Sequence, residues 1–302
     1  MGGQWAVSMT MVSEVWPPKE RGRAVGIVQT SFPVGFIYAS LLAYGIGEQA
    51  GWRILLMLGA LPALFAGPVC YVMIRESRRW LHSMSEPKAE PVSYRQLFAP
   101  GLRRNTILGT LIMFVGAFGA WSVNPWIPAY LGRLGVPSAR VPLYTLYVMV
   151  GALLGYILYG FISDRMGRKF TFRLFFIGMA CALLCFGFLP SQTWFASLAP
   201  SPLLWLVIIG GLVTFFLGYF SGYGALFAEL FPTRVRSRGM GFCYTIGGIG
   251  AALSPAATGY LSVHIGMGYA FMLASLPFLA GAVLVQLFQE TKGKSLQEEV
   301  PG

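Results

Sequence analysis

Acidic and basic residues recur at one fixed spacing in two distant parts of the chain. Glu14 is followed seven residues later by Arg21, and Glu229 is followed seven residues later by Arg236, with a Pro three residues after each Glu. The two copies lie 215 residues apart. Carboxylate and guanidinium groups can form charge-assisted hydrogen bonds with each other. The repeated spacing indicates that the chain contains a duplicated unit.

The only Asp of the chain lies in a third charged motif, Gly-Phe-Ile-Ser-Asp-Arg-Met-Gly-Arg-Lys at 160–169. Gly160 allows two helices to approach closely, and Gly167 permits a tight turn between the two apolar stretches that the motif joins. Asp164 lies where a carboxylate can meet basic neighbours or a helix N-terminus. We therefore expect Asp164 to contact basic residues or the N-terminus of a helix.

The residue types that catalysis or metal binding requires do not form a group. His82 and His264 are the only two His, and the four Cys form no C-x-x-C pair. A nucleophile with its base, or a metal cluster, needs several such groups at one site. We therefore expect no enzyme activity, no metal and no cofactor. Cys181 and Cys185, four residues apart in an apolar stretch, are expected to be buried and unreactive.

The composition indicates a membrane protein. Of the 302 residues, 56% are hydrophobic and 11% are charged, and the mean hydropathy is +0.64. A soluble domain is about one quarter charged. The net charge of +11 comes from basic residues grouped between long apolar stretches, which is typical of cytoplasmic loops and does not indicate nucleic-acid binding. We predict an all-α integral membrane protein.

Eight stretches are long and apolar enough to cross a hydrocarbon core, which takes about 20 residues as a helix. Residues 1–16 form a ninth segment that is short at its front end. With the loop at 17–23 assigned to the cytoplasm, 19 basic residues fall in cytoplasmic loops and 3 outside. This asymmetry predicts a multi-pass protein of the inner (plasma) membrane with a cytoplasmic C-terminus. The eight stretches are 24–46, 53–74, 105–131, 143–163, 171–190, 203–227, 240–262 and 268–288.

The repeat also predicts how the helices divide. A second match, Arg-Glu-Ser at 75–77 and Gln-Glu-Thr at 289–291, has its Glu residues 214 apart, and duplicated halves are usual in secondary transporters. Applied backwards, the offset places about 110 residues and three helices, with the front of a fourth, ahead of Met1. About nine of twelve helices are then present. The predicted units are three spans of an N-terminal half at 1–74, a cytoplasmic linker at 75–104, a six-helix C-terminal half at 105–288 and a cytoplasmic tail at 289–302.

These motifs resemble those of the major facilitator superfamily. Segment 160–169 matches its G-x-x-x-D-R-x-G-R-K loop, and both Glu-to-Arg repeats fit its E-x-x-P-x-x-x-R pattern. Segments 75–81 and 290–293 are similar to the P-E-S-x-R-W-L and P-E-T-K-G tails of sugar-porter-like members, with the leading Pro replaced. Segments 2–5 and 29–35 most resemble the proton-coupled symporters of sialic, lactate-type and aromatic acids. The antiporter signature G-x-x-x-G-P-x-x-G is absent from 24–46, which favours uptake over efflux.

The resemblance implies rocker-switch transport by two six-helix halves with a central binding site. The implied activity is proton-coupled uptake of a small organic acid or sugar-like metabolite, with the solute, protons and the lipid bilayer as partners of a monomer. A cytoplasmic charge network would close one state. Glu14 and Arg21 would serve the first half, with their partner loop in the absent part. The implied network residues of the second half are Asp164, Arg165, Arg168, Glu229 and Arg236.

The substrate site is expected among polar and aromatic residues at membrane depth. None of the eight complete stretches carries a charge near its centre, so a central proton acceptor is expected in the absent helices. Gln29 and Asn124 can hydrogen-bond a carboxylate or a hydroxyl, and aromatic rings can stack on a sugar or aryl face. Aromatic residues also form interfacial belts and fill packing space, so both roles stay open. The candidates are Gln29, Trp121, Asn124, Trp126, Tyr147, Tyr219, Tyr223 and Tyr244.

Two other functions stay compatible with the sequence. A nutrient sensor can keep a transporter fold without transport, although only residues 289–302 follow the last span. An inactive remnant is the other, because nine helices cannot close a two-half cavity as twelve can. Substrate-dependent proton uptake by vesicles separates a transporter from both.

Overall fold

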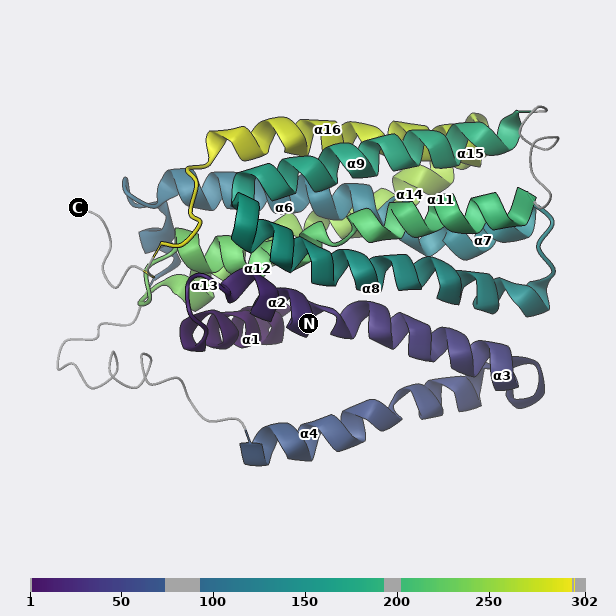
Figure 1. The fold of residues 1–302 in the computed structure, drawn as a ribbon, viewed down its shortest axis with the longest axis horizontal. Coiled ribbons are helices and arrows are strands. Elements are labelled where there is room, and N and C mark those ends of the chain that lie inside the picture. The colour runs from purple at the N-terminus through teal and green to yellow at the C-terminus, as the bar shows by residue number, and fades with distance from the viewer. Residues whose placement is uncertain (1, 74–92, 193–201, 295, 297–302) are drawn as a thin grey trace.

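The computed structural model describes residues 2–73, 93–192, 202–294 and 296, and every regular element in them is a helix (Figure 1). Helices form because an apolar segment must satisfy its backbone polar groups internally. The predicted all-α architecture is confirmed. The α-helices are α1 (Gly2–Val15), α2 (Arg21–Gln29), α3 (Ser31–Gly59), α4 (Leu61–Met73), α6 (Arg103–Trp121), α7 (Ile127–Arg133), α8 (Val141–Met166), α9 (Arg168–Phe188), α11 (Pro202–Phe216), α12 (Tyr219–Leu230), α13 (Arg236–Gly247), α14 (Ile249–His264), α15 (Met267–Leu273) and α16 (Ser275–Leu284). Short 3-10 helices are η1 (Tyr94–Phe98), η2 (Asn124–Trp126), η3 (Ser138–Arg140), η4 (Leu189–Ser191) and η5 (Val285–Leu287).

Seven helical stretches of the described residues have the length and hydropathy needed to cross a membrane. Two predicted segments are helical but are not among the seven. Residues 1–16 contain α1, which has 14 residues, and residues 240–262 are divided between α13 and α14 at Gly248. The predicted linker lies outside the described residues as far as residue 92, so the division into units stays a prediction. The seven stretches are Arg21–Gly47, Gln49–Val72, Arg103–Arg133, Ser138–Met166, Arg168–Phe188, Val207–Leu230 and Met267–Leu287.

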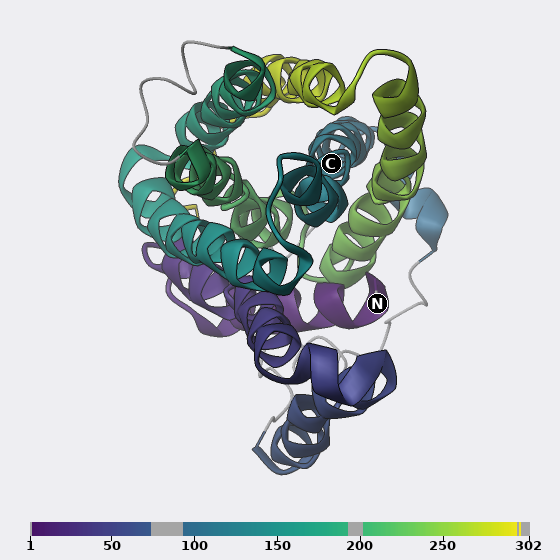
Figure 2. The ribbon, with the colours of Figure 1, turned by 90° about the vertical axis from the view of Figure 1, so that its right-hand side faces the viewer.

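The N-terminal helices cover one face of a larger C-terminal group of helices (Figures 1 and 2). α2 and α3 pack along α8, and α1 packs along α13. α3 reverses direction at Gly51, whose φ of 70° lies in the left-handed region that Gly adopts without strain. The Tyr38 hydroxyl donates to the Leu58 carbonyl at 2.8 Å and ties the two arms of this hairpin together. The returning arm, which continues into α4, stands apart from the bundle (Figure 2).

Two glycines bring α2 and α8 close together. A Cβ on Gly160 would lie 2.7 Å from the carbonyl oxygen of Gly22, and a Cβ on Gly26 would lie 2.9 Å from that of Tyr156. The close helix approach predicted for Gly160 is confirmed. Because small residues allow this approach, the C-terminal end of α8, with Asp164, reaches the N-terminus of α2.

Aromatic rings fill the space between α9, α12 and α16. Phe176 packs edge-on against Tyr219 with ring centroids 4.8 Å apart, and Tyr219 contacts Phe278 at 5.7 Å. Cys181 and Cys185, also on α9, are exposed on the bundle surface, so the expectation that these thiols are buried is wrong. A helix that is apolar all round carries no periodic signal for its inward face.

Candidate functional site

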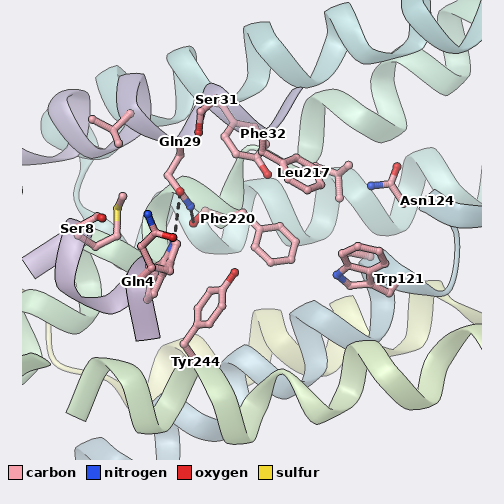
Figure 3. Close-up of a pocket in the computed structure, with 15 residues that line it drawn as sticks. Gln4, Ser8, Gln29, Ser31, Phe32, Trp121, Asn124, Leu217, Phe220 and Tyr244 are labelled. Atoms are coloured by element: carbon pink, nitrogen blue, oxygen red, sulfur yellow. Dashed lines mark hydrogen bonds between the residues drawn. The ribbon is translucent and has the colours of Figure 1, made fainter. Parts of the chain in front are cut away.

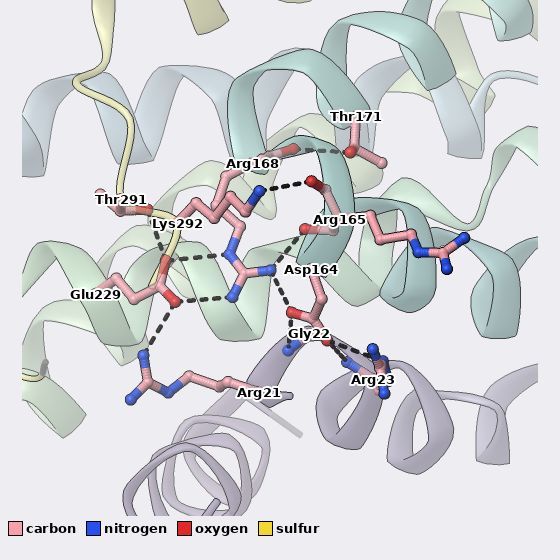
Figure 4. A network of polar contacts seen from close by, with 12 residues as sticks. Arg21, Gly22, Arg23, Asp164, Arg165, Arg168, Thr171, Glu229, Thr291 and Lys292 are labelled. Atoms are coloured by element: carbon pink, nitrogen blue, oxygen red, sulfur yellow. Dashed lines mark hydrogen bonds and ion pairs between the residues drawn. The ribbon is translucent and has the colours of Figure 1, made fainter. Parts of the chain in front are cut away.

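Asp164 accepts hydrogen bonds from the N-terminus of α2 (Figure 4). Its Oδ1 accepts from the N–H of Gly22 and its Oδ2 from the N–H of Arg23, each at 2.9 Å. Arg168 Nη1 donates to Oδ1 at 2.8 Å. The first N–H groups of a helix have no partner within the helix and carry the positive end of its dipole. Since Glu20 makes no side-chain cap there, Asp164 supplies the cap from another helix.

Glu229 joins α12 to α2, to α9 and to the C-terminal segment. Its Oε1 accepts from Arg21 Nη1 at 3.0 Å, and Arg168 donates to both oxygens, at 2.9 and 3.2 Å. The Thr291 hydroxyl donates to Oε2 at 2.6 Å. The side chains of Glu229, Arg21 and Arg168 are each 1% exposed. A charge buried this deeply is tolerated only with such partners. Asp164, Arg168 and Glu229, which were predicted to associate, lie together in one buried cluster.

A second ion pair mirrors the Arg21–Glu229 pair. Arg236 Nη1 donates to Glu14 Oε1 at 2.7 Å, so each repeated motif supplies the acid for the arginine of the other. The Nε groups match as well, because Arg21 donates to the Ser13 carbonyl at 3.0 Å and Arg236 to the Ala228 carbonyl at 3.1 Å. The expectation that Glu14 and Arg21 find their partners in an absent loop is wrong for these contacts, since α1 and α2 contact α12 and α13 directly.

The segment after η5 crosses the same end of the bundle. Glu290 accepts from the N–H of Arg168 at 2.9 Å and from that of Lys169 at 3.2 Å. It therefore caps the N-terminus of α9 in the way that Asp164 caps the N-terminus of α2. Lys292 Nζ donates to the Arg165 carbonyl at 2.5 Å. The Arg165 side chain is exposed and points away from the buried cluster (Figure 4), so this contact with the network is made by its backbone.

A cavity of about 490 Å³ lies between the N-terminal helices and the C-terminal group. Four of the predicted binding residues line it, namely Gln29, Trp121, Asn124 and Tyr244. In Figure 3 the Tyr244 hydroxyl points into this space, and Trp121 and Asn124 lie at the opposite end from Gln4. The structure therefore brings together residues that lie more than 200 positions apart. The other lining residues are Gln4, Trp5, Ser8, Met9, Val28, Ser31, Phe32, Ala120, Tyr156, Leu217 and Phe220.

Trp5 contacts two other residues that line this cavity, Gln29 and Tyr244. It is not among the binding residues predicted from the sequence. Its Nε1 donates to Gln29 Oε1 at 3.3 Å, and Gln29 Nε2 donates to the Phe220 carbonyl at 3.4 Å. The Trp5 and Tyr244 rings stack with centroids 3.9 Å apart and planes at 20°. In the sequence, segment 2–5 indicates only the family resemblance. A Trp in a short apolar helix gives no sign of which neighbour it faces.

Four other predicted residues are not among those that line the cavity. The Tyr219 hydroxyl donates to the Gly116 carbonyl at 2.8 Å and the Tyr223 hydroxyl to the Ile112 carbonyl at 3.0 Å, with both rings fully buried in packing. Tyr147 is 50% exposed on α8. Trp126 packs beside Gly259 of α14. The polar atoms of the two buried tyrosines are thus used to join α12 to α6.

The side chains lining the cavity are amides, hydroxyls, indoles and apolar groups. Amide and indole groups bind polar solutes by directional hydrogen bonds, and the aromatic rings offer faces for a flat solute. In the part of the chain that the structure describes, no three His, Cys, Asp or Glu side chains gather as metal ligands. The arrangement suits reversible binding of a small solute between two groups of helices.

Comparison with known proteins agrees with this geometry. The family model described as Major Facilitator Superfamily matches residues 1–214 and 193–302. A cis,cis-muconate transport protein of Acinetobacter baylyi is 30% identical over 300 residues, which cover 97% of this chain and 70% of that protein. The niacin transporter NiaP of the same organism is 28% identical, covering 98% of this chain and 72% of the relative. The sialic acid transporter NanX of Escherichia coli is 28% identical, with coverages of 94% and 67%.

A solved structure of similar shape is that of the proton:xylose symporter XylE. It superimposes with a TM-score of 0.76 at 20% sequence identity, covering 96% of this chain and 69% of XylE. At this identity the likeness shows the fold.

Proposed function

The chain belongs to the Major Facilitator Superfamily, and on that premise we propose that it is a secondary transporter that takes up a small organic acid by alternating access. Its relatives include transporters of muconate, niacin and sialic acid, which are small solutes with a carboxyl group. Coupling to protons is the finer part of the proposal, and it rests on the resemblance to proton-coupled members.

The observation that carries the proposal is the relation between the cavity and the ion pairs. Helices of both repeats line the cavity, and the same helices are joined at one end by the Glu14–Arg236 and Arg21–Glu229 pairs. Opening that end requires buried charge-assisted contacts to break. Contacts of this kind bias a two-state interface by a few kcal/mol, which is the size of bias that a transport cycle can reverse.

We assign the end with the ion pairs, and with it the C-terminus, to the cytoplasmic side of the inner membrane. The support is the clustering of basic residues in the connections at that end. A monomer with the bilayer around it is the working unit of this proposal.

Transport is tested with the purified full chain in liposomes. Uptake of radiolabelled cis,cis-muconate, nicotinate and sialic acid is measured with and without an inward proton gradient. We expect at least one acid to accumulate in the liposomes. Its uptake should be faster with the gradient, and accumulation should be absent after a protonophore is added. Absence of uptake of all three would contradict organic-acid transport, and uptake indifferent to the protonophore would contradict proton coupling alone.

A further inference from the structure

Two hydrogen-bond donors in the cavity are placed side by side and are bonded within the protein. The Trp5 indole N–H donates to Gln29, and the Gln29 amide donates to the backbone carbonyl of Phe220. An indole can only donate, whereas an amide can do both. Trp5 Nε1 bonds the oxygen of the same amide group that carries Gln29 Nε2. The two N–H donors are therefore neighbours.

Both of these hydrogen bonds are long. Their donor–acceptor distances are 3.3 and 3.4 Å, while N–H···O bonds in proteins cluster near 2.9–3.0 Å. An ionised acceptor forms shorter bonds that are about twice as strong. A carboxylate entering the cavity can therefore displace these two contacts and accept from both nitrogens.

The surroundings keep the indole where a ligand can reach it. Trp5 stacks on Tyr244 of α13, which fixes the plane of its ring, and both Trp5 and Gln29, the acceptor of its N–H, line the cavity. Phe32, Phe220 and Trp121 add aromatic faces to the same cavity. A flat conjugated body attached to a carboxylate matches this combination of two donors and several ring faces.

We propose that Trp5 Nε1 and Gln29 Nε2 form a carboxylate subsite for a planar, conjugated or aromatic acid, with Tyr244 as the residue that positions the indole. The proposal rests on the proposed function, since it names how the transported acid is held. Recognition by two neutral donors resembles the stabilisation of an anion by oriented N–H dipoles.

The test compares an acid with its amide. Nicotinate and nicotinamide share one ring and differ in the group that the subsite would hold. Their binding to the purified full chain in nanodiscs is measured by calorimetry, and gentisate and cis,cis-muconate serve as further carboxylate probes. For Trp5→Phe, which keeps a ring on Tyr244 and removes the N–H, we expect nicotinate affinity to fall about tenfold, the worth of one hydrogen bond to a charged group. We expect nicotinamide binding to change less than threefold.

Trp121→Phe is the matched control, because it makes the same substitution at the far end of the same cavity. It should change the binding of acid and amide by similar factors. Equal loss of nicotinate and nicotinamide in Trp5→Phe would overturn the subsite, as would a wild-type chain that binds none of the three acids. Either result would leave transport of another solute intact, whereas failure of uptake in liposomes with acid binding preserved would overturn transport alone.

A second measurement observes the Trp5 indole of the wild-type chain directly. The indole ¹H–¹⁵N signal of Trp5, assigned by its loss in Trp5→Phe, should move downfield when nicotinate binds and stay within line width for nicotinamide. A signal that stays in place with saturating nicotinate would overturn the proposal.

Discussion

The Glu14 carboxylate bonds the guanidinium of Arg236, 222 residues later in the chain, at 2.7 Å. Its repeat equivalent Glu229 bonds Arg21 at 3.0 Å, so the two copies of the motif exchange their acids. Each motif is broken by a turn between its Glu and its Arg, because α1 ends at Val15 and α2 begins at Arg21. The two pairs therefore link the two repeats.

Neutralising the two acids should have unequal effects on stability. Glu229→Gln removes a carboxylate from two buried guanidinium groups, Arg21 and Arg168, of which Arg168 keeps Asp164, and should lower the free energy of unfolding by roughly 3–5 kcal/mol. Glu14→Gln affects one arginine, which keeps the Ala228 and Phe231 carbonyls as acceptors, and should cost roughly 1–3 kcal/mol. Thermal midpoints in detergent measure both. Glu20→Gln is the control, because its pair with Arg23 is exposed. Equal midpoints for all three variants would contradict the network.

Asp164→Asn should slow transport while the protein still reaches the membrane. Asn keeps one oxygen for the α2 N-terminus but turns an NH₂ group toward donors of Arg23 or Arg168, so the cap and the ion pair cannot both persist. We expect initial uptake rates in liposomes to fall at least about tenfold, the effect of about 1.4 kcal/mol on a rate. Unchanged rates in a variant present at wild-type levels would exclude a gating role.

Substituting the buried Tyr219 or Tyr223 should affect stability, whereas substituting Tyr244 should affect the affinity for acids. Tyr219→Phe and Tyr223→Phe each remove one hydroxyl-to-carbonyl bond and should cost about 1 kcal/mol of stability with little change in acid affinity. Tyr244→Phe keeps the stack on Trp5 but removes a hydroxyl that points into the cavity (Figure 3), so affinity should change instead. Calorimetry with thermal midpoints distinguishes them. Loss of affinity in Tyr223→Phe at wild-type stability would return that residue to the binding site.

Gly160→Ala should be destabilising although Ala favours helices. Its Cβ would meet the Gly22 carbonyl oxygen at 2.7 Å, and moving α2 away would cost roughly 1–3 kcal/mol, as overpacking does. Gly35→Ala is the matched control, since its Cβ would have no neighbour within 4 Å and should gain up to about 1 kcal/mol of helix propensity. Equal thermal midpoints for both variants would contradict the close α2–α8 contact.

The sequence by itself determined the helical class, most of the spans and which charged residues are candidates for a network. Hydropathy is a local property, so an apolar stretch such as 171–190 can be predicted as a spanning helix without knowledge of the segments that pack against it. Asp164, Arg168 and Glu229 could be named because charged side chains are rare here, and their spacing matches a family pattern. Among the polar residues, Gln29 and Asn124 stood out because an unpaired amide is costly in lipid.

Only the tertiary structure decided which partners these residues take. Trp5 reaches Gln29 and Tyr244 because α1 lies against α2 and α13, and Tyr219 turns into packing while Tyr244 faces the cavity. In helices that are apolar on every side, periodicity does not mark the inward face. Which face is inward, and which repeat supplies an ion-pair partner, follows from contacts between segments far apart in the chain.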